Sequence, residues 1–441
     1  MKHLIATVAC FVCAFATPVH AQTARADSTA CVGRWSPPFP VQRDDGRPVY
    51  IEQAMITAFA HQTLALGSPT FFWLGRNHMA PPEALTDKAA VVWSFSRAGA
   101  LMDSAGTAVG LPPVDTLHPR NTPRLMAQDE HTAFVAWAAA DSESKSPGAN
   151  DNRVEVASFD GQRWSAPRTI ITAPHITLDP TPAVRAGRGL STPVIAVSAR
   201  DSAGYFVRVA RANGENWITS DWRGQIFTIL SAVASEWTDG SVTLIVMGSL
   251  HGYGPVPVPG VYSVRGEPNA NGYTWAQPQL IDSLRDSYEA FSSARLGGDS
   301  LVVAWYGPRV KGEAGVLNTA LSIDRGRSWA LTPSLSPRSA VDGVQLAVDS
   351  SGGLHAVFRG VPEAQAHVLG APGLIVHSAW RSGRWTTPTA VSKDASWTSP
   401  ALGSSSGGGL MAMWATAELV PPGGAMPRSF ASVWTAGCAS R

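Results

Sequence analysis

Short apolar segments separated by turns run along most of the chain. The strongest ones follow a glycine or a polar turn and read HTAFVAWAA, STPVIAVSA, GSVTLIVMG, DSLVVAWYG, GGLHAVFRG and GGLMAMWAT. A weaker apolar run precedes most of them, as in TPRLMAQ and VQLAVDS, and another follows, as in RVEVASFD and LIVHSAW. Apolar runs of this length, bounded by glycine and polar residues, predict β-strands.

A tryptophan preceded by a glycine closes five of these units. The five are Trp164, Trp217, Trp275, Trp329 and Trp385, spaced by 53, 58, 54 and 56 residues. Counting the tryptophan strand, each unit holds four strands in about 55 residues, and four antiparallel strands repeated radially form the blade of a β-propeller. The sequence therefore predicts an all-β chain of four-stranded antiparallel blades.

Two further units complete the predicted ring. Residues 50–112 carry a sixth unit whose tryptophan has drifted, and residues 396–436 carry a seventh with three strands only. We expect VGRWSPP, residues 32–38, to supply the missing fourth strand from the other end of the chain. Pairing of the N- and C-terminal strands would close a seven-bladed propeller, with six blades as the alternative count.

The first 21 residues resemble a secretory signal. Lys2 and His3 precede the apolar run LIATVACFVCAFA, and small residues stand before Gln22. No later stretch has the 18 or so uninterrupted apolar residues of a membrane-spanning helix. We expect residues 1–21 to be removed and residues 22–441 to form one exported domain, periplasmic or extracellular.

Two cysteines remain after the leader, Cys31 and Cys438, one near each end of the chain. In an oxidising compartment a single pair most simply forms one disulfide, which would hold the two termini within a few ångströms of each other. The alternative is two free thiols.

Composition narrows the possible partners. A net charge of +1 argues against nucleic acid or an anionic membrane as the main partner. The histidines show no metal-binding spacing, and no phosphate loop or nucleophile elbow is present. No metal or cofactor is expected.

One repeat carries a sharper motif. SIDRGRSW, residues 322–329, fits Ser-x-Asp-x-Gly-x-x-Trp, and SFDGQRW is a shortened version. The chain thereby resembles the sialidase-like propellers built from Asp-box (BNR) repeats. In such a turn Asp324 accepts backbone N–H bonds with Ser322 beside it, Gly326 permits a positive φ, and Trp329 packs between blades. The motif is structural, so Asp324 is not a catalytic candidate.

The resemblance implies little about activity, because Asp boxes occur in sialidases, other glycosidases, lectin-like modules and receptor ectodomains. A sialidase would carry an Arg-Ile-Pro motif, three arginines on the substrate carboxylate, an aspartate acid/base and a Tyr–Glu nucleophile pair. The chain has no Arg-Ile-Pro; the nearest run is NTPRLMA.

In sialidase-like propellers the functional face is lined by loops that leave the second strand of each blade or enter the first. Mapping this pattern onto the repeats gives the candidate ligand-binding residues Arg76, His78, Arg200, His251, Tyr253, Tyr306, Arg309 and Arg359. Converging guanidinium groups would grip an anion, most naturally a carboxylate, while Tyr253 or Tyr306 would stack on a sugar ring or act as nucleophile. The alternative is that these arginines are solvated or pair with acids such as Asp201 and Glu313.

The sequence favours a propeller that binds a glycan or another anionic ligand on its loop face. An exo-glycosidase of the sialidase type and a protein-interaction module are the two alternatives.

Overall fold

The chain is all-β in a computed structural model. The structure describes residues 35, 37–40, 50–52, 64–65, 70–74, 89–94, 107–110, 124–127, 133–139, 152–159, 165–177, 181–182, 194–214, 216–251, 256–284, 291–307, 316–335, 341–349, 352–360, 373–396, 400–404, 410–419 and 429–438. These residues contain no helix and form seven antiparallel sheets of four or five strands. The prediction of an all-β chain of antiparallel sheets is confirmed.

The first three sheets follow one another along the chain. The first contains β3 (Leu64–Ala65), β4 (Thr70–Leu74), β5 (Ala89–Ser94) and β6 (Thr107–Gly110). The second contains β7 (Arg124–Ala127), β8 (Ala133–Ala139), β9 (Arg153–Phe159) and β10 (Arg168–Thr172). The third contains β11 (His175–Ile176), β12 (Thr181–Pro182), β13 (Val194–Asp201), β14 (Gly204–Asn213) and β15 (Asn216–Trp222).

The next three repeat the same strand order. The fourth sheet contains β16 (Ile226–Glu236), β17 (Val242–Leu250), β18 (Val258–Asn269), β19 (Gly272–Trp275) and β20 (Gln279–Ser283). The fifth contains β21 (Phe291–Gly297), β22 (Ser300–Gly307), β23 (Val316–Ser322) and β24 (Ala330–Leu335). The sixth contains β25 (Val341–Val348), β26 (Leu354–Gly360), β27 (Leu374–Arg381), β28 (Arg384–Trp385) and β29 (Thr389–Ala390).

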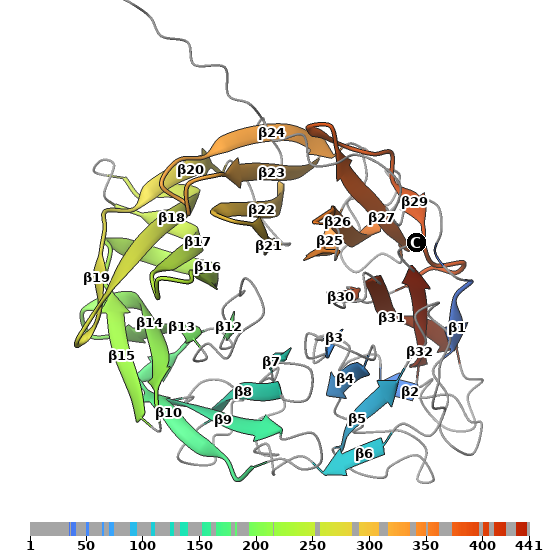
Figure 1. Ribbon diagram of the computed structural model, residues 1–441, viewed down its shortest axis with the longest axis horizontal. Helices are drawn as coiled ribbons and strands as arrows, with labels where there is room; N and C mark the ends of the chain where they lie inside the picture. Colours follow the sequence, from blue (N-terminus) through green and yellow to red (C-terminus); the bar gives the residue numbers. More distant parts are fainter. Residues whose placement is uncertain are drawn as a thin grey trace, which may run out of the picture.

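The seventh sheet joins both ends of the chain. It contains β30 (Ala401–Ser404), β31 (Leu410–Leu419) and β32 (Ser429–Cys438), and β32 pairs with β1 (Phe39–Pro40) and β2 (Tyr50–Glu52). Figure 1 shows the sheets set around a common centre, with β16, β21 and β25 close to it and β15, β19 and β24 at the rim. This radial arrangement is that of a β-propeller.

The N-terminal pairing differs from the prediction in its position. The strand on β32 is Phe39–Pro40, directly after the predicted residues 32–38, and Tyr50–Glu52 joins the same sheet rather than the 50–112 unit. Pro37 and Pro38 explain the shift, because a proline has no N–H to donate to a ladder. Pro40 lies on an edge strand, where prolines are tolerated.

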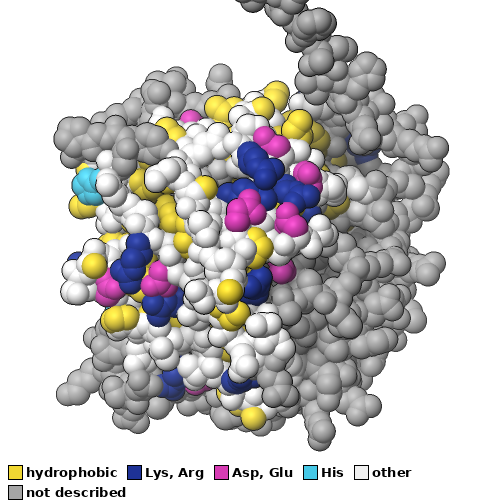
Figure 2. All heavy atoms as spheres, turned by 60° about the vertical axis from the view of Figure 1, so that its left-hand side comes forward, with side chains coloured by type: hydrophobic (Ala, Val, Ile, Leu, Met, Phe, Trp, Pro, Cys, Tyr) yellow, Lys and Arg dark blue, Asp and Glu magenta, His cyan; other side chains and the backbone are white. Residues whose placement is uncertain are grey.

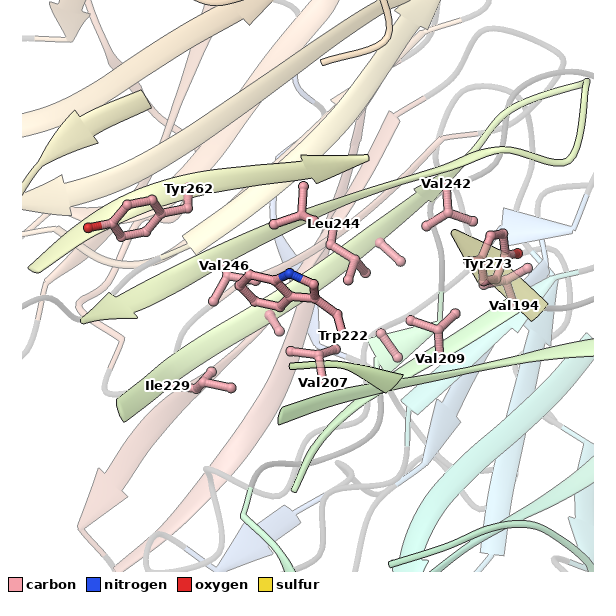
Figure 3. Packing of buried hydrophobic residues seen from close by; sticks show 14 of the residues in the cluster. Val194, Val207, Val209, Trp222, Ile229, Val242, Leu244, Val246, Tyr262 and Tyr273 are labelled. Carbon is pink, nitrogen blue, oxygen red and sulfur yellow. The ribbon is translucent and has the colours of Figure 1, made fainter. Parts of the chain in front are cut away.

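The second strands β13, β17, β22 and β26 are buried on both faces along most of their length. In β13, Val194 and Ala196 pack in the core between the third and fourth sheets, whereas Ile195, Val197 and Ala199 pack in the core between the second and third. Since neighbouring residues of a strand point to opposite faces, a strand between two other sheets is apolar at almost every position. Figure 3 shows one such core, with Trp222 lying among Val207, Ile229 and Val246.

Three of the repeat tryptophans join their sheet to the one before it. Trp275 donates from its indole Nε1 to Ser220 Oγ (3.2 Å), Trp329 to Ser263 Oγ (2.9 Å) and Trp385 to Thr319 Oγ1 (3.2 Å). Each acceptor lies in the preceding sheet. For Trp329 and Trp385 it lies 66 residues earlier, on the third strand of that sheet. The period found in the sequence is thus the spacing of one repeated contact.

The interface of the sixth and seventh sheets replaces this hydrogen bond by a ring contact. Trp35 packs in the core of this interface, with its ring edge-on to His377 of β27 at 5.3 Å and 65°. Trp35 Nε1 is buried and has no hydrogen-bond partner among the described residues. His377 therefore occupies the place that a hydroxyl takes in the preceding interfaces.

His377 belongs to a buried polar chain. His355 Nδ1 lies 2.9 Å from His377 Nε2, His355 Nε2 lies 3.0 Å from Asp349 Oδ2, and Asp349 Oδ1 accepts the Gly353 N–H. When His355 donates from Nε2 to the Asp349 carboxylate, its Nδ1 carries no proton and accepts a hydrogen bond from the Nε2–H of His377. Burial, the neighbouring His355 and Arg381 lower the pKa of His377 to about 3.

This shift predicts acid sensitivity. The unfolded chain binds a proton on residue 377 below a pH of about 6.5, whereas the folded protein binds it only near pH 3, so the free energy of unfolding falls as pH drops through that window. In His377→Thr the decline in melting temperature from pH 7 to pH 4 should be shallower. At pH 7 this variant should lose about 1–3 kcal/mol, because His355 Nδ1 loses its partner.

His175→Thr is the matched control, since His175 is half-buried and takes no part in the hydrogen bonds among His377, His355 and Asp349. It should keep the wild-type dependence of melting temperature on pH. Equal slopes for both variants would contradict the assignment.

Candidate functional site

Four of the predicted ligand residues lie at the ends of second strands. Arg200 is next to last in β13, His251 directly follows β17, Tyr306 is next to last in β22, and Arg359 is next to last in β26. Because these strands hold the same place in four successive sheets, their ends lie on one side of the ring, which we call the second-strand face. The other four candidates, Arg76, His78, Tyr253 and Arg309, lie outside the described residues.

Arg200 lies in a row of three side chains across the third sheet. Its strand pairs with β11 and β14, which place His175 on one side of it and Tyr205 on the other. Directly paired residues point to the same face of a sheet. The Arg200 guanidinium lies 5.2 Å from the centre of the Tyr205 ring, and Tyr205 packs against the core between the third and fourth sheets.

The segment after Arg200 is not the loop that was predicted. β13 and β14 are joined by a turn of two residues, Ser202 and Ala203. Asp201 Oδ1 accepts the Ala203 N–H at 2.9 Å, and Gly204 has a φ of 118°, which favours glycine. The carboxylate therefore fixes a tight hairpin.

Two other arginines of the third sheet are paired with acids. Arg208 binds Asp221 through both ends of its guanidinium, Nε to Oδ1 at 2.6 Å and Nη2 to Oδ2 at 2.8 Å. Arg223 Nη2 binds Asp201 Oδ2 at 2.7 Å and Asp221 Oδ2 at 3.2 Å. The bond to Arg223 lowers the pKa of Asp201. Both guanidinium groups lie over the Phe206 ring, at 5.2 Å and 4.2 Å.

His251 forms an aromatic pair on the next sheet. Its ring meets Phe227 edge-on at 5.5 Å and 83°, and its backbone N–H donates to Gln225 O at 2.7 Å. Phe227 is 59% exposed, an unusual fraction for a phenylalanine. The pair offers an accessible aromatic surface beside the start of β16.

Tyr306 and Arg359 lie in strands and not in loops. Tyr306 is half-buried and packs against the core between the fifth and sixth sheets. Arg359 is only 4% exposed, and its backbone pairs with Asp342 and Ile375 on the two sides. The expected loop position of Arg359 differs from the structure, because β26 continues through it to Gly360 between two paired strands.

The motif at residues 322–329 forms the turn between β23 and β24, at the opposite end of the sheet. Asp324 Oδ1 accepts the Ser328 N–H and the Ser322 hydroxyl, each at 2.8 Å, and Gly326 has a φ of 80°. Burial would raise the pKa of Asp324, but these hydrogen bonds lower it overall. Trp329 donates to Ser263 on the preceding sheet. Ser322, Asp324 and Trp329 therefore all form hydrogen bonds that stabilise the fold.

Sequence reasoning missed an ion-pair network beside this turn. Arg325 binds both Asp239, in the turn after β16, and Asp299, in the turn after β21. Arg265 of β18 binds Glu267 at 2.5 Å and the hydroxyl of Ser241 at 2.9 Å. Figure 2 shows basic and acidic side chains interspersed on this side of the molecule. The sequence indicates this network only through Asp239 and Asp299, which stand in the turns after the first strands of two successive sheets.

Neither a metal site nor a membrane-spanning helix occurs in the described part of the chain. No three histidine, cysteine, aspartate or glutamate side chains there come together as a metal site would require. No described helix is long and apolar enough to cross a membrane.

Comparison with known proteins gives distant structural likenesses only. No protein-family model and no curated protein matches the sequence. The polysaccharide lyase Uly1 is 10% identical with a TM-score of 0.47, covering 95% of both chains. An α-L-arabinanase from Penicillium chrysogenum is 12% identical with a TM-score of 0.44, covering 79% of this chain and 98% of its own. A Dyadobacter fermentans protein of unknown function is 13% identical with a TM-score of 0.40, covering 71% of this chain and 93% of its own.

The paired arginines predict a local contribution to stability. Asp221→Asn removes the carboxylate shared by Arg208 and Arg223, and it should lower the free energy of unfolding by about 1 kcal/mol, a modest value because the side chains are partly exposed. The loss should shrink in high salt. Urea unfolding at low and high salt measures both effects.

Asp394→Asn serves as the control, since Asp394 is exposed and has no ion-pair partner among the described residues. Equal unfolding free energies for the two variants would show that the Asp221 contacts add nothing.

Proposed function

We propose that the protein binds a glycan or another anionic ligand on its second-strand face. The observation that supports this proposal is the placement of Arg200, His251 and Tyr306 at the ends of the second strands of three successive sheets. Arginine and aromatic side chains gathered on one face of a ring are suited to an acidic saccharide, since guanidinium binds oxyanions and aromatic rings contact sugar faces.

We further propose that residues 1–21 are a secretory signal and that residues 22–441 form a single exported domain, periplasmic or extracellular. On this proposal the domain is a seven-bladed propeller, and the N-terminal segment closes it at the seventh sheet. Two observations support this closure: β1 pairs with β32, and the Trp35 ring contacts His377.

A disulfide between Cys31 and Cys438 remains a prediction. Cys31 and the side chain of Cys438 lie outside the described residues. Phe39 pairs with Thr435, so the same register would place residue 36 opposite Cys438, and Cys31 lies five residues before that point (36 − 31 = 5). The segment must therefore turn back toward β32 to form the bond.

The disulfide has a direct test. The secreted protein should weigh two protons less than its reduced form, and Cys31→Ser and Cys438→Ser should each destabilise it by about 2–5 kcal/mol without adding to each other. Intact mass and thermal unfolding measure these effects. Two alkylatable thiols in the native protein would contradict the bond.

Binding and catalysis separate in two assays. We expect the purified protein to bind acidic glycans on an array and to leave a fluorogenic sialoside uncleaved. Turnover of the sialoside would instead favour the exo-glycosidase, with Tyr253 or Tyr306 as the nucleophile. Neither binding nor turnover would favour the protein-interaction module.

A further inference from the structure

We propose that the row His175, Arg200 and Tyr205 is the subsite for an acidic sugar, a uronate, with Arg200 holding its carboxylate. This inference rests on the proposed glycan-binding function and adds the residue that selects for charge. The argument concerns the third sheet alone, whose strands are described along the whole row.

Arg200, unlike Arg208 and Arg223, has no acidic partner among the described residues. Arg208 and Arg223 share Asp221, and Arg223 also binds Asp201. Arg211, near the other end of β14, lies over the ring of Tyr273 at 5.5 Å. Arg200 is thus an exposed cation whose donors are free for a ligand.

The geometry of the strand keeps Arg200 unpaired. Its nearest acid in sequence, Asp201, is the next residue of β13, and neighbouring residues of a strand point to opposite faces of the sheet. The Asp201 carboxylate is also occupied by Arg223 and by the Ala203 N–H. An acid that would otherwise neutralise Arg200 is therefore held on the other face.

Tyr205 positions the guanidinium and offers a surface for a sugar ring. The Arg200 guanidinium stacks near the ring at 5.2 Å, a cation–π contact that restrains the arginine without neutralising its charge. Tyr205 is itself anchored, because it packs against the core between the third and fourth sheets. A restrained guanidinium loses less side-chain entropy when it binds a carboxylate.

The row fits a short piece of a saccharide. Three adjacent strands span about 10 Å, since strands lie about 4.8 Å apart. Two linked sugar rings cover such a length, so Arg200 at the centre would bind a carboxylate in bidentate fashion while His175 and Tyr205 flank the sugar faces. Carboxylate is favoured over neutral hydroxyls because charge-assisted bonds are the stronger ones.

The test measures binding of defined saccharides by calorimetry. Trigalacturonate should bind to the wild-type protein with an affinity that falls as salt rises, and cellotriose should bind at least ten-fold more weakly. Arg200→Ala should weaken trigalacturonate binding about 10- to 100-fold, the equivalent of a lost charge-assisted hydrogen bond. The affinity of Arg200→Lys for trigalacturonate should fall between those of the wild type and Arg200→Ala. Tyr205→Phe should bind trigalacturonate as the wild type does, since the sugar would contact only the face of the ring.

Arg384→Ala is the matched control, because Arg384 is an exposed arginine that begins β28, directly after the turn from β27 and at the opposite end of its sheet. The melting temperature of every variant shows that it is folded. Equal trigalacturonate affinity of Arg200→Ala and Arg384→Ala would overturn this inference and leave the proposed function standing.

Other outcomes are equally distinct. Tighter binding of dextran sulfate than of trigalacturonate, lost in Arg200→Ala, would show that the row takes sulfate esters and would overturn the choice of a uronate. Equal binding of cellotriose and trigalacturonate would overturn the selection for charge but keep a glycan site. No binding of any of these saccharides or of an acidic glycan array would overturn the proposed function and this inference together.

Discussion

The contact between a rim tryptophan and the preceding sheet is the interaction on which the architecture depends. The third, fourth and fifth sheets are apolar on both faces, so none of them can be stable in water alone and each lies between two others. Core packing alone does not fix how two such sheets are aligned along their strands. A hydrogen bond from an indole N–H to one hydroxyl of the neighbouring sheet does, because it is directional, and Trp275, Trp329 and Trp385 each make one.

The interface of the sixth and seventh sheets solves the same problem with different chemistry. There the tryptophan comes from the other end of the chain, and its edge-on contact with His377 takes the place of the hydroxyl bond. The imidazole is oriented from behind by His355 and Asp349, a buried chain in which each donor has an acceptor. The tryptophan contacts of the three preceding interfaces use hydroxyl acceptors, whereas this one uses an imidazole, which can titrate.

The sequence predicts what depends on periodicity. Strand positions followed from apolar runs because both faces of a second strand are buried, and the tryptophan spacing followed from one contact made once per repeat. The sequence does not reveal interactions set by strand pairing. The division of Arg200 and Asp201 between two faces depends on where β13 ends, and the burial of Arg359 depends on how far β26 extends. The bonds of Arg325 to two turns of neighbouring sheets, Asp239 and Asp299, join residues 86 and 26 positions away.

The short turn after β13 determines how a ligand could approach the third sheet. Ser202 and Ala203 are its only residues, whereas the connection from β17 to β18 takes residues 251–257 and that from β22 to β23 takes residues 308–315. The two-residue turn therefore does not project beyond the end of β13 as a longer loop would. A polymer crossing Arg200 at this point would not have to thread its terminus past that turn, so a monomer in the middle of a long chain would be as accessible as one at its end.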